Sequence, residues 1–291
     1  MSRGVERETE CTIGEVVDRA CDLGAAVVGV APVERFEQAE GSYLPSGYGP
    51  GRLLPGARSV VVVAVRLLDG VLASNLQPLD TTFAYGDFGY VRLNRVLGDI
   101  TYALAAWLES LGWSSLPLGA CGAARIDRAA YEAGRTVGPL SGIFSLKRAA
   151  VLAGVGRRSR SGLVATERYG TRVRLGAVVT AAPLEGSPAL AGNACPDGCR
   201  LCVSVCPMGT IADDGVVNHV KCYSDMGRRG RDEAESLDEV SRAHAAQGVR
   251  EGYLPYDHPA IDGLGNRMCR VVCMAVCPLW QFDLRQGGST A

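Results

Sequence analysis

Eight of the eleven cysteines lie between positions 195 and 277, and their spacing restricts what the last third of the chain can fold around. The first group is Cys195, Cys199, Cys202 and Cys206, the second is Cys269, Cys273 and Cys277, and Cys222 lies alone between them. Each group ends in the dipeptide Cys-Pro. Thiols separated by two or three residues can share one tight loop, whose backbone N–H groups can also point at anionic sulfur atoms. This combination predicts iron–sulfur clusters.

The spacing also predicts how the thiols are divided. The last three cysteines of the first group keep the C-x2-C-x3-C-P spacing of bacterial ferredoxins, and only the step from Cys195 to Cys199 is one residue longer. In two-cluster ferredoxins the cysteine before the proline ligates the other cluster. We therefore expect two [4Fe-4S] clusters, one held by Cys195, Cys199, Cys202 and Cys277, and the other by Cys206, Cys222, Cys269 and Cys273.

Other chemistries fit parts of this pattern. A C-x2-C pair also suits tetrahedral zinc. Cys195-x3-Cys199-x2-Cys202 matches the triad of radical-SAM enzymes, but in that superfamily a barrel follows the triad, and only 85 residues follow Cys206. Structural disulfides are disfavoured, because residues 1–7 carry no signal-peptide pattern and a reducing cytosol is expected. We expect the three remaining cysteines to be small buried apolar residues. These are Cys11, Cys21 and Cys121.

Charge and hydropathy narrow the range of partners. The formal net charge of −1 gives no basic surplus for binding nucleic acid or an anionic membrane. The longest apolar run, Val60 to Val65, is far shorter than the roughly 20 residues that span a bilayer. We expect a cytoplasmic protein whose partners are a small-molecule substrate and an electron donor, with no nucleic acid and no membrane.

The first part of the chain alternates helix and strand signals. Thr12 and Glu15 have the capping-box spacing and begin a helical stretch that stops near Gly24. Residues 26–31 and 60–65 are short apolar runs typical of buried strands, and leucines recur at helical spacing over residues 93–111. These patterns predict an α/β domain.

The middle of the chain predicts a mixed sheet. Residues 162–166 and 172–180 look like strands joined by a short turn, which favours an antiparallel hairpin, and residues 145–154 favour helix. No G-x-G-x-x-G follows a strand, so a nicotinamide site is not supported. Residues 183–193 form a linker rich in proline, glycine and small residues. We expect an α/β cofactor- and substrate-binding domain at residues 1–185 and a ferredoxin-like double-cluster domain at residues 186–291.

Several segments resemble the epoxyqueuosine reductase family, which is related to reductive dehalogenases. The most specific are Ala153-Gly-Val-Gly156, Ser161-Gly-Leu-Val-Ala-Thr-Glu-Arg-Tyr-Gly170, Arg174-Leu-Gly-Ala-Val-Val-Thr180 and Gly265-Asn-Arg267. The resemblance implies an oxidoreductase in which a nitroreductase-like domain holds cobalamin against the cluster domain. Electrons would come from an external low-potential donor such as ferredoxin or flavodoxin. They would pass through both clusters to cobalamin, or directly to a substrate.

The resemblance also suggests site residues. It implies cofactor contacts at Gly86, Gly154, Gly156 and Ser161. A plain loop explains Gly86 equally, whereas the match to the family favours the cofactor role for Gly154 and Gly156. Where the family carries an acidic proton donor, residues 140–148 contain no carboxylate, and Lys147 takes that place. Tyr85 and Tyr131 are further candidate proton donors.

Two expectations concern the substrate and the class of protein. Nothing after Trp280 could form the helical-repeat tRNA-binding extension of the tRNA enzyme, so we expect a small substrate. A protein that only carries electrons or docks a partner, without cobalamin, remains the alternative. The large first domain favours an enzyme.

Overall fold

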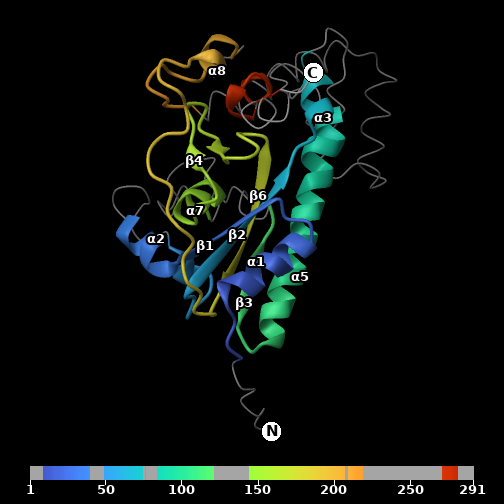
Figure 1. The fold of residues 1–291 in the computed structure, drawn as a ribbon, viewed down its shortest axis with the longest axis vertical. Helices are drawn as coiled ribbons and strands as arrows, with labels where there is room; N and C mark the ends of the chain where they lie inside the picture. The colour runs from blue at the N-terminus through green and yellow to red at the C-terminus, as the bar shows by residue number, and fades with distance from the viewer. Residues whose placement is uncertain are drawn as a thin grey trace, which may run out of the picture.

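The computed structural model describes residues 9–39, 49–74, 76, 84–120, 144–206, 209–218 and 271–280. Its centre is a four-stranded sheet in the order β1-β2-β6-β3 (Figure 1). The strands are β1 (Val27–Pro32), β2 (Ser59–Arg66), β6 (Val173–Thr180) and β3 (Ser115–Leu118). The edge strand β3 contains Pro117, which is tolerated there because an edge residue need not donate to a neighbouring strand.

All strand pairs in this sheet are antiparallel, so the prediction of a mixed sheet is wrong. Because β6 is antiparallel to both β2 and β3, these two strands run in the same direction. The helical connection between them is therefore a crossover of the kind that joins parallel strands. The late strand β6 inserts between them and takes their hydrogen bonds, which local sequence patterns do not reveal.

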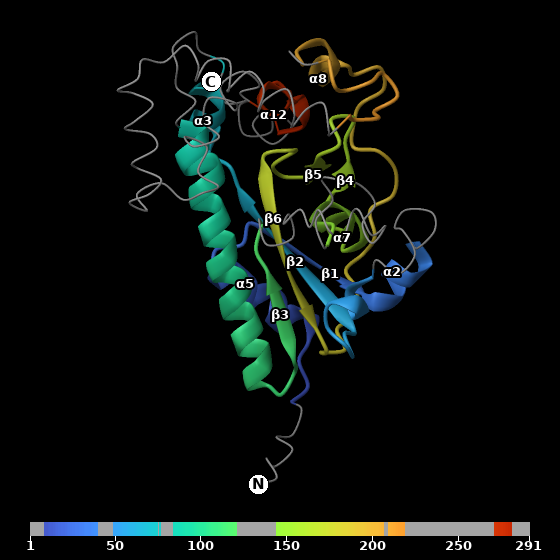
Figure 2. The ribbon, with the colours of Figure 1, turned by 180° about the vertical axis from the view of Figure 1, so that it is seen from behind.

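The predicted hairpin is also wrong in its pairing. Strand β5 (Val164–Ala165) pairs with β4 (Arg157–Arg158), while β6 pairs with β2 and β3. The turn between β5 and β6 is closed by a bridge between Thr166 and Gly170. This separate two-stranded sheet places the segment 157–165 at one end of the main sheet (Figure 2).

Helices cover both faces of the main sheet. On one face α1 (Ile13–Asp22) and α5 (Arg92–Ser110) pack on alternate residues of β2, including Val61 and Val63. On the other face α2 (Val33–Ala39) and α7 (Leu146–Leu152) pack on Val60 and Val62. Since successive strand residues point to opposite faces, the unbroken apolar run of β2 fits a strand buried on both sides. The predicted helices at α1, α5 and α7 and the strands β1, β2 and β6 are confirmed.

A third apolar cluster joins the C-terminal segment to one end of this layer. It contains Leu67, Leu72, Met274 and Ala275, with Tyr85 packed against it. The elements involved are α3 (Asp69–Ser74), the π-helix η2 (Tyr85–Val91), which continues into α5, and α12 (Val272–Ala275). Next to α12 lies α8 (Leu201–Ser204), and η4 (Pro278–Trp280) follows α12 in the chain. The short helix η1 (Pro50–Arg52) packs against α2. Within the described ranges, no helix combines the length and apolar character needed to cross a bilayer.

Replacing Thr12 with alanine is expected to lower the free energy of unfolding by about 1 kcal/mol. The Glu15 N–H donates to Thr12 Oγ1 at 3.3 Å, and the Thr12 N–H donates to Glu15 Oε2 at 2.8 Å. Urea denaturation of Thr12→Ala and of the matched Thr12→Ser variant measures the effect. Equal stability of the two variants would contradict the cap.

The same cap predicts a pH dependence. The Thr12 N–H, and then its hydroxyl, lower the pKa of Glu15. A carboxyl with a lowered folded-state pKa stabilises the fold above its unfolded pKa, and this contribution is lost as the pH falls through the folded value. The difference between wild type and Thr12→Ala should therefore shrink in acid.

Candidate iron–sulfur centre

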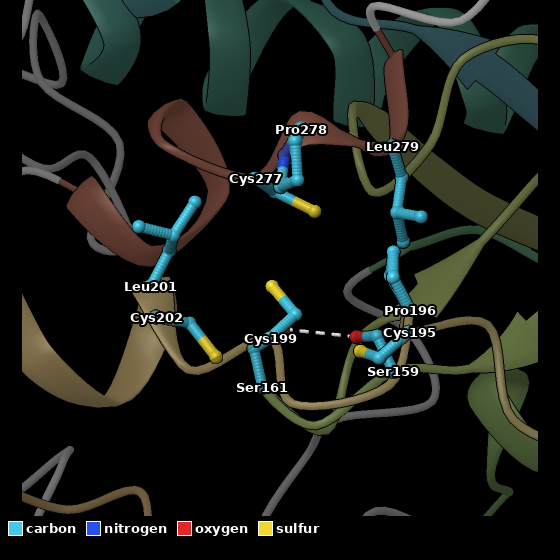
Figure 3. Close-up of a pocket in the computed structure, with 10 residues that line it drawn as sticks. All are labelled: Ser159, Ser161, Cys195, Pro196, Cys199, Leu201, Cys202, Cys277, Pro278 and Leu279. Atoms are coloured by element: carbon cyan, nitrogen blue, oxygen red, sulfur yellow. Dashed lines mark hydrogen bonds between the residues drawn. The ribbon is translucent and has the colours of Figure 1, made fainter.

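Four cysteines from two distant parts of the sequence line one pocket, which lies where the chain around α8 meets the segment after α12 (Figure 3). They are Cys195 and Cys199 from the loop that leads into α8, Cys202 from the start of α8, and Cys277 from the chain just after α12. Their sulfur atoms face a common space, whose empty volume of about 290 Å³ is partly open to solvent. These are the four thiols that the sequence assigns to a single cluster.

The remaining lining is mostly apolar, with two hydroxyl groups. It consists of Ser159, Ser161, Pro196, Leu201, Pro278 and Leu279. A tight turn spaces the first thiols, since the Cys199 N–H donates to the Pro196 carbonyl at 3.1 Å and Gly198 adopts a left-handed φ of 72°. That φ favours glycine, because a side chain would be strained there. The turn sends Cys195 and Cys199 to the same side of the loop.

Backbone N–H groups approach two of the sulfur atoms. The Arg160 N–H donates to Cys195 Sγ at 3.2 Å, and the Leu279 N–H lies near enough to the Cys277 thiol to lower its pKa. Burial raises the pKa of Cys277, and both the Leu279 N–H and the Thr171 hydroxyl partly oppose that shift. Donors of this kind favour anionic sulfur, as in iron–sulfur proteins.

The thiols also act on one another. Burial, followed by the charges of Cys195, Cys277 and Cys199, raises the pKa of Cys202. Packing several thiolates in a half-buried pocket is therefore unfavourable unless positive charge is placed among them. Iron ions supply that charge, so the donor set suits a cluster.

The arrangement bears on the zinc alternative. Among the residues that the structure describes, no three His, Cys, Asp or Glu side chains converge closely enough to hold one metal ion. The four thiols surround a space instead of meeting at a point. This geometry fits a multi-atom cluster better than a single ion. A buried Thr171 hydroxyl, which makes no regular hydrogen bond within the described chain, is a further polar group at this site.

The second predicted ligand set is only partly described. Cys206 lies 3.3 Å from Thr210 Oγ1, and Cys273 is half-buried in α12, which packs against α8. Cys222 and Cys269 lie outside the described residues. The second cluster stays a prediction.

The structure describes all four residues that were predicted to contact a cofactor, namely Gly86, Gly154, Gly156 and Ser161. Ser161 lines the cysteine pocket, where its hydroxyl and that of Ser159 share a 2.9 Å hydrogen bond. A Cβ at Gly154, where φ is +68°, would lie 2.1 Å from the Pro188 carbonyl oxygen, and one at Gly156 would lie 2.5 Å from the Ala165 carbonyl oxygen. Both glycines are therefore required by packing of the chain on itself. Gly86 is buried in η2.

The candidate proton donors do not gather at the pocket. Lys147 is exposed on the first turn of α7, and Tyr85 packs its ring over Gly89 beside the third apolar cluster. Neither lines the cysteine pocket as described, and Tyr131 lies outside the described residues. Of the isolated cysteines, Cys21 is exposed, so the prediction of burial is wrong for it. Cys11 is half-buried, and Cys121 lies outside the described residues.

Sequence reasoning missed Arg172 and Thr171, which lie beside Cys277. The Arg172 guanidinium is buried and donates to the Ala275 carbonyl in α12 at 3.1 Å. The sequence feature that could have indicated Arg172 is a charged residue directly before an apolar strand and just after a tight turn. Because strand ends are commonly exposed, the predicted strand at residues 172–180 gave no indication that Arg172 is buried.

Comparison with known proteins places the chain in a family. No family model matches it. An epoxyqueuosine reductase from Gloeobacter violaceus is 30% identical over 253 residues, covering 78% of this chain and 70% of that protein. The chain belongs to the epoxyqueuosine reductase family. A second member, from Staphylococcus aureus, is 26% identical and covers 94% of this chain, which spans 66% of that protein.

Solved structures share the fold of this family member. The epoxyqueuosine reductase of Bacillus subtilis aligns with a TM-score of 0.50 and 19% identity over 75% of this chain and 56% of its own. A variant of a catabolic reductive dehalogenase aligns with a TM-score of 0.50 and 15% identity over 89% of this chain and 35% of its own. At these identities the likeness is one of fold: an α/β layer with an antiparallel sheet.

Proposed function

We propose that this chain is an iron–sulfur oxidoreductase that passes electrons through two [4Fe-4S] clusters to reduce a small molecule in its α/β domain. The observation that carries the proposal is the pocket lined by Cys195, Cys199, Cys202 and Cys277. Bringing thiols from two segments about 75 residues apart into one half-buried pocket is unfavourable unless they bind a common group. Membership of a reductase family supports the same chemistry.

The chain's own residues would hold and insulate the cluster. The four thiols would ligate iron, and the Arg160 and Leu279 N–H groups would donate to the ligating sulfur atoms. Leu201, Leu279 and Pro278 would limit the access of water to the cluster. Hydrogen bonding and solvent access are two of the factors that set a cluster's reduction potential.

Cobalamin is the acceptor that the family resemblance implies, and when bound it would supply a strongly reducing cobalt centre. The described residues do not form an open cradle for it at Gly154 and Gly156, because carbonyl groups of the chain fill the space that a side chain would take. These two glycines therefore do not supply a cobalamin contact. Direct reduction of the substrate is the other route that we propose to test.

The proposed substrate is a small molecule and not epoxyqueuosine in tRNA. A net charge of −1 offers no general attraction to a phosphate backbone, which dominates nucleic-acid affinity. Residues 140–148 also lack the carboxylate that the family places there. An external low-potential donor such as ferredoxin or flavodoxin would supply the electrons.

Anaerobic reconstitution tests the proposal. We expect iron and acid-labile sulfide in amounts that match two four-iron clusters, and an EPR signal after reduction that reduced flavodoxin or ferredoxin can also generate. Stoichiometric zinc without sulfide would contradict the proposal.

A second experiment, the addition of cobalamin, separates reduction through cobalamin from direct reduction of the substrate. Retention of cobalamin on gel filtration with a changed absorption spectrum favours the first route, while turnover without cobalamin favours the second. Loaded clusters with neither outcome would indicate the electron-carrier alternative.

A further inference from the structure

A buried arginine stands beside the cluster pocket without being part of the thiol set. Only 6% of the Arg172 side chain is exposed. Its Nη1 donates to Asp69 Oδ1 at 2.8 Å, and its Nη2 donates to the Ala275 carbonyl at 3.1 Å. Burying a guanidinium is unfavourable unless its surroundings compensate for the charge, and the Asp69 carboxylate and the Ala275 carbonyl provide that compensation here.

The contacts of Arg172 join three segments at the pocket. Asp69 is the first residue of α3, Ala275 is the last residue of α12, and the Arg172 carbonyl accepts from the Leu67 N–H at 2.9 Å. Ala275 is two residues before Cys277. The guanidinium therefore holds the segment that presents the Cys277 thiol against the end of the main sheet.

The charge of this group reaches the pocket. Burial lowers the pKa of Arg172, whereas Asp69 and Cys277 oppose that shift. An arginine stays protonated at any ordinary pH. The carboxylate of Asp69 also pairs with Arg66 at 2.5 Å, and 43% of its side chain is exposed. Water screens the half-exposed Asp69 carboxylate more than the buried guanidinium, whose Nη2 donates to the Ala275 carbonyl two residues before Cys277.

We propose that Arg172 raises the reduction potential of the cluster held by Cys195, Cys199, Cys202 and Cys277, and so sets how readily that cluster accepts an electron. This inference rests on the proposed function. Reduction adds negative charge to an assembly that is already anionic, and a buried cation beside one ligand stabilises the reduced form more than the oxidised form. Local charge is an established determinant of cluster potential. Arg172 is a positioning residue that acts through the cluster and does not ligate it.

The test is an EPR-monitored redox titration of the reconstituted full-length chain. The signal that is absent from a Cys199→Ala variant identifies the relevant cluster. Arg172→Gln is expected to reduce the equilibrium constant for one-electron reduction of this cluster roughly ten-fold, a fall of about 59 mV. Asp69→Asn keeps the shape of the side chain but removes the opposing charge, so the potential should rise.

Two further variants separate charge from packing. Arg66→Gln removes a half-exposed cation that pairs with the same carboxylate, and it should change the potential far less than Arg172→Gln. Arg172→Lys keeps the charge without the two-armed hydrogen bonding, so it should retain most of the wild-type potential even if the protein unfolds at a lower temperature.

Several outcomes would overturn the inference. Full iron content with an unchanged potential in Arg172→Gln would do so, as would shifts of the same sign in Arg172→Gln and Asp69→Asn. If Arg172→Gln fails to incorporate iron, an unchanged or lower potential in Asp69→Asn would still overturn it. Absence of iron and sulfide from the wild-type chain would instead contradict the proposed function, so the two failures are distinguishable.

Discussion

Replacing Cys199 with alanine is expected to halve the iron and sulfide content of the reconstituted protein and to abolish reduction of the substrate. Cys199 lies between Cys195 and Cys202 in the loop that supplies three of the four thiols of the pocket. Losing one thiolate opens a coordination position to water, so the cluster no longer assembles stably and its iron and sulfide are lost. Because the two clusters would act in series, loss of one interrupts the electron path completely.

The matched control for this prediction is Cys21→Ser. Cys21 is an exposed thiol in α1, a helix that lies well away from α8 (Figure 1). It should keep the full iron content, the EPR signals and turnover. Unchanged iron content in Cys199→Ala, or an equal loss in both variants, would show that the pocket does not hold the cluster.

Gly154→Ala is expected to lower the free energy of unfolding by about 3 kcal/mol or more, if the variant folds at all. Two costs combine, because φ is +68° at Gly154 and the added Cβ would lie 2.1 Å from the Pro188 carbonyl oxygen. The clash is with backbone, which cannot move aside as a flexible side chain can. Urea denaturation followed by circular dichroism measures the loss, and failure to accumulate folded protein is its extreme form.

Gly98→Ala is the control for this substitution. Gly98 lies within α5, and an added Cβ there meets nothing within 4 Å, so the change should leave stability equal or raise it by about 0.5–1 kcal/mol. If Gly154→Ala folds with wild-type stability but loses affinity for cobalamin, the packing role is contradicted and the glycine belongs to a cofactor site.

Much of the fold followed from local patterns. The capping box at Thr12, the valine run of β2 and the leucine spacing of α5 each predicted an element that is present. Each of these signals lies within a few residues of the element that it specifies. The pairing of the strands did not follow, because β6 comes late in the chain and inserts between β2 and β3. Nothing in its own sequence states which neighbours it takes.

For the candidate site, too, some features followed from the sequence and others only from the tertiary structure. The cysteine spacing by itself predicts iron–sulfur chemistry and placed the thiols of Cys195, Cys199 and Cys202 together, since ligand spacing within a loop is a local property. The ferredoxin pattern added Cys277 as the fourth predicted ligand. Only the tertiary structure brought Cys277 to the loop of Cys195 and placed a buried guanidinium next to it. The charge beside a ligand depends on contacts between residues about a hundred positions apart, such as Arg172 with Asp69 and with Ala275. Burial and field are properties of the packed chain, so no spacing of residues could have supplied them.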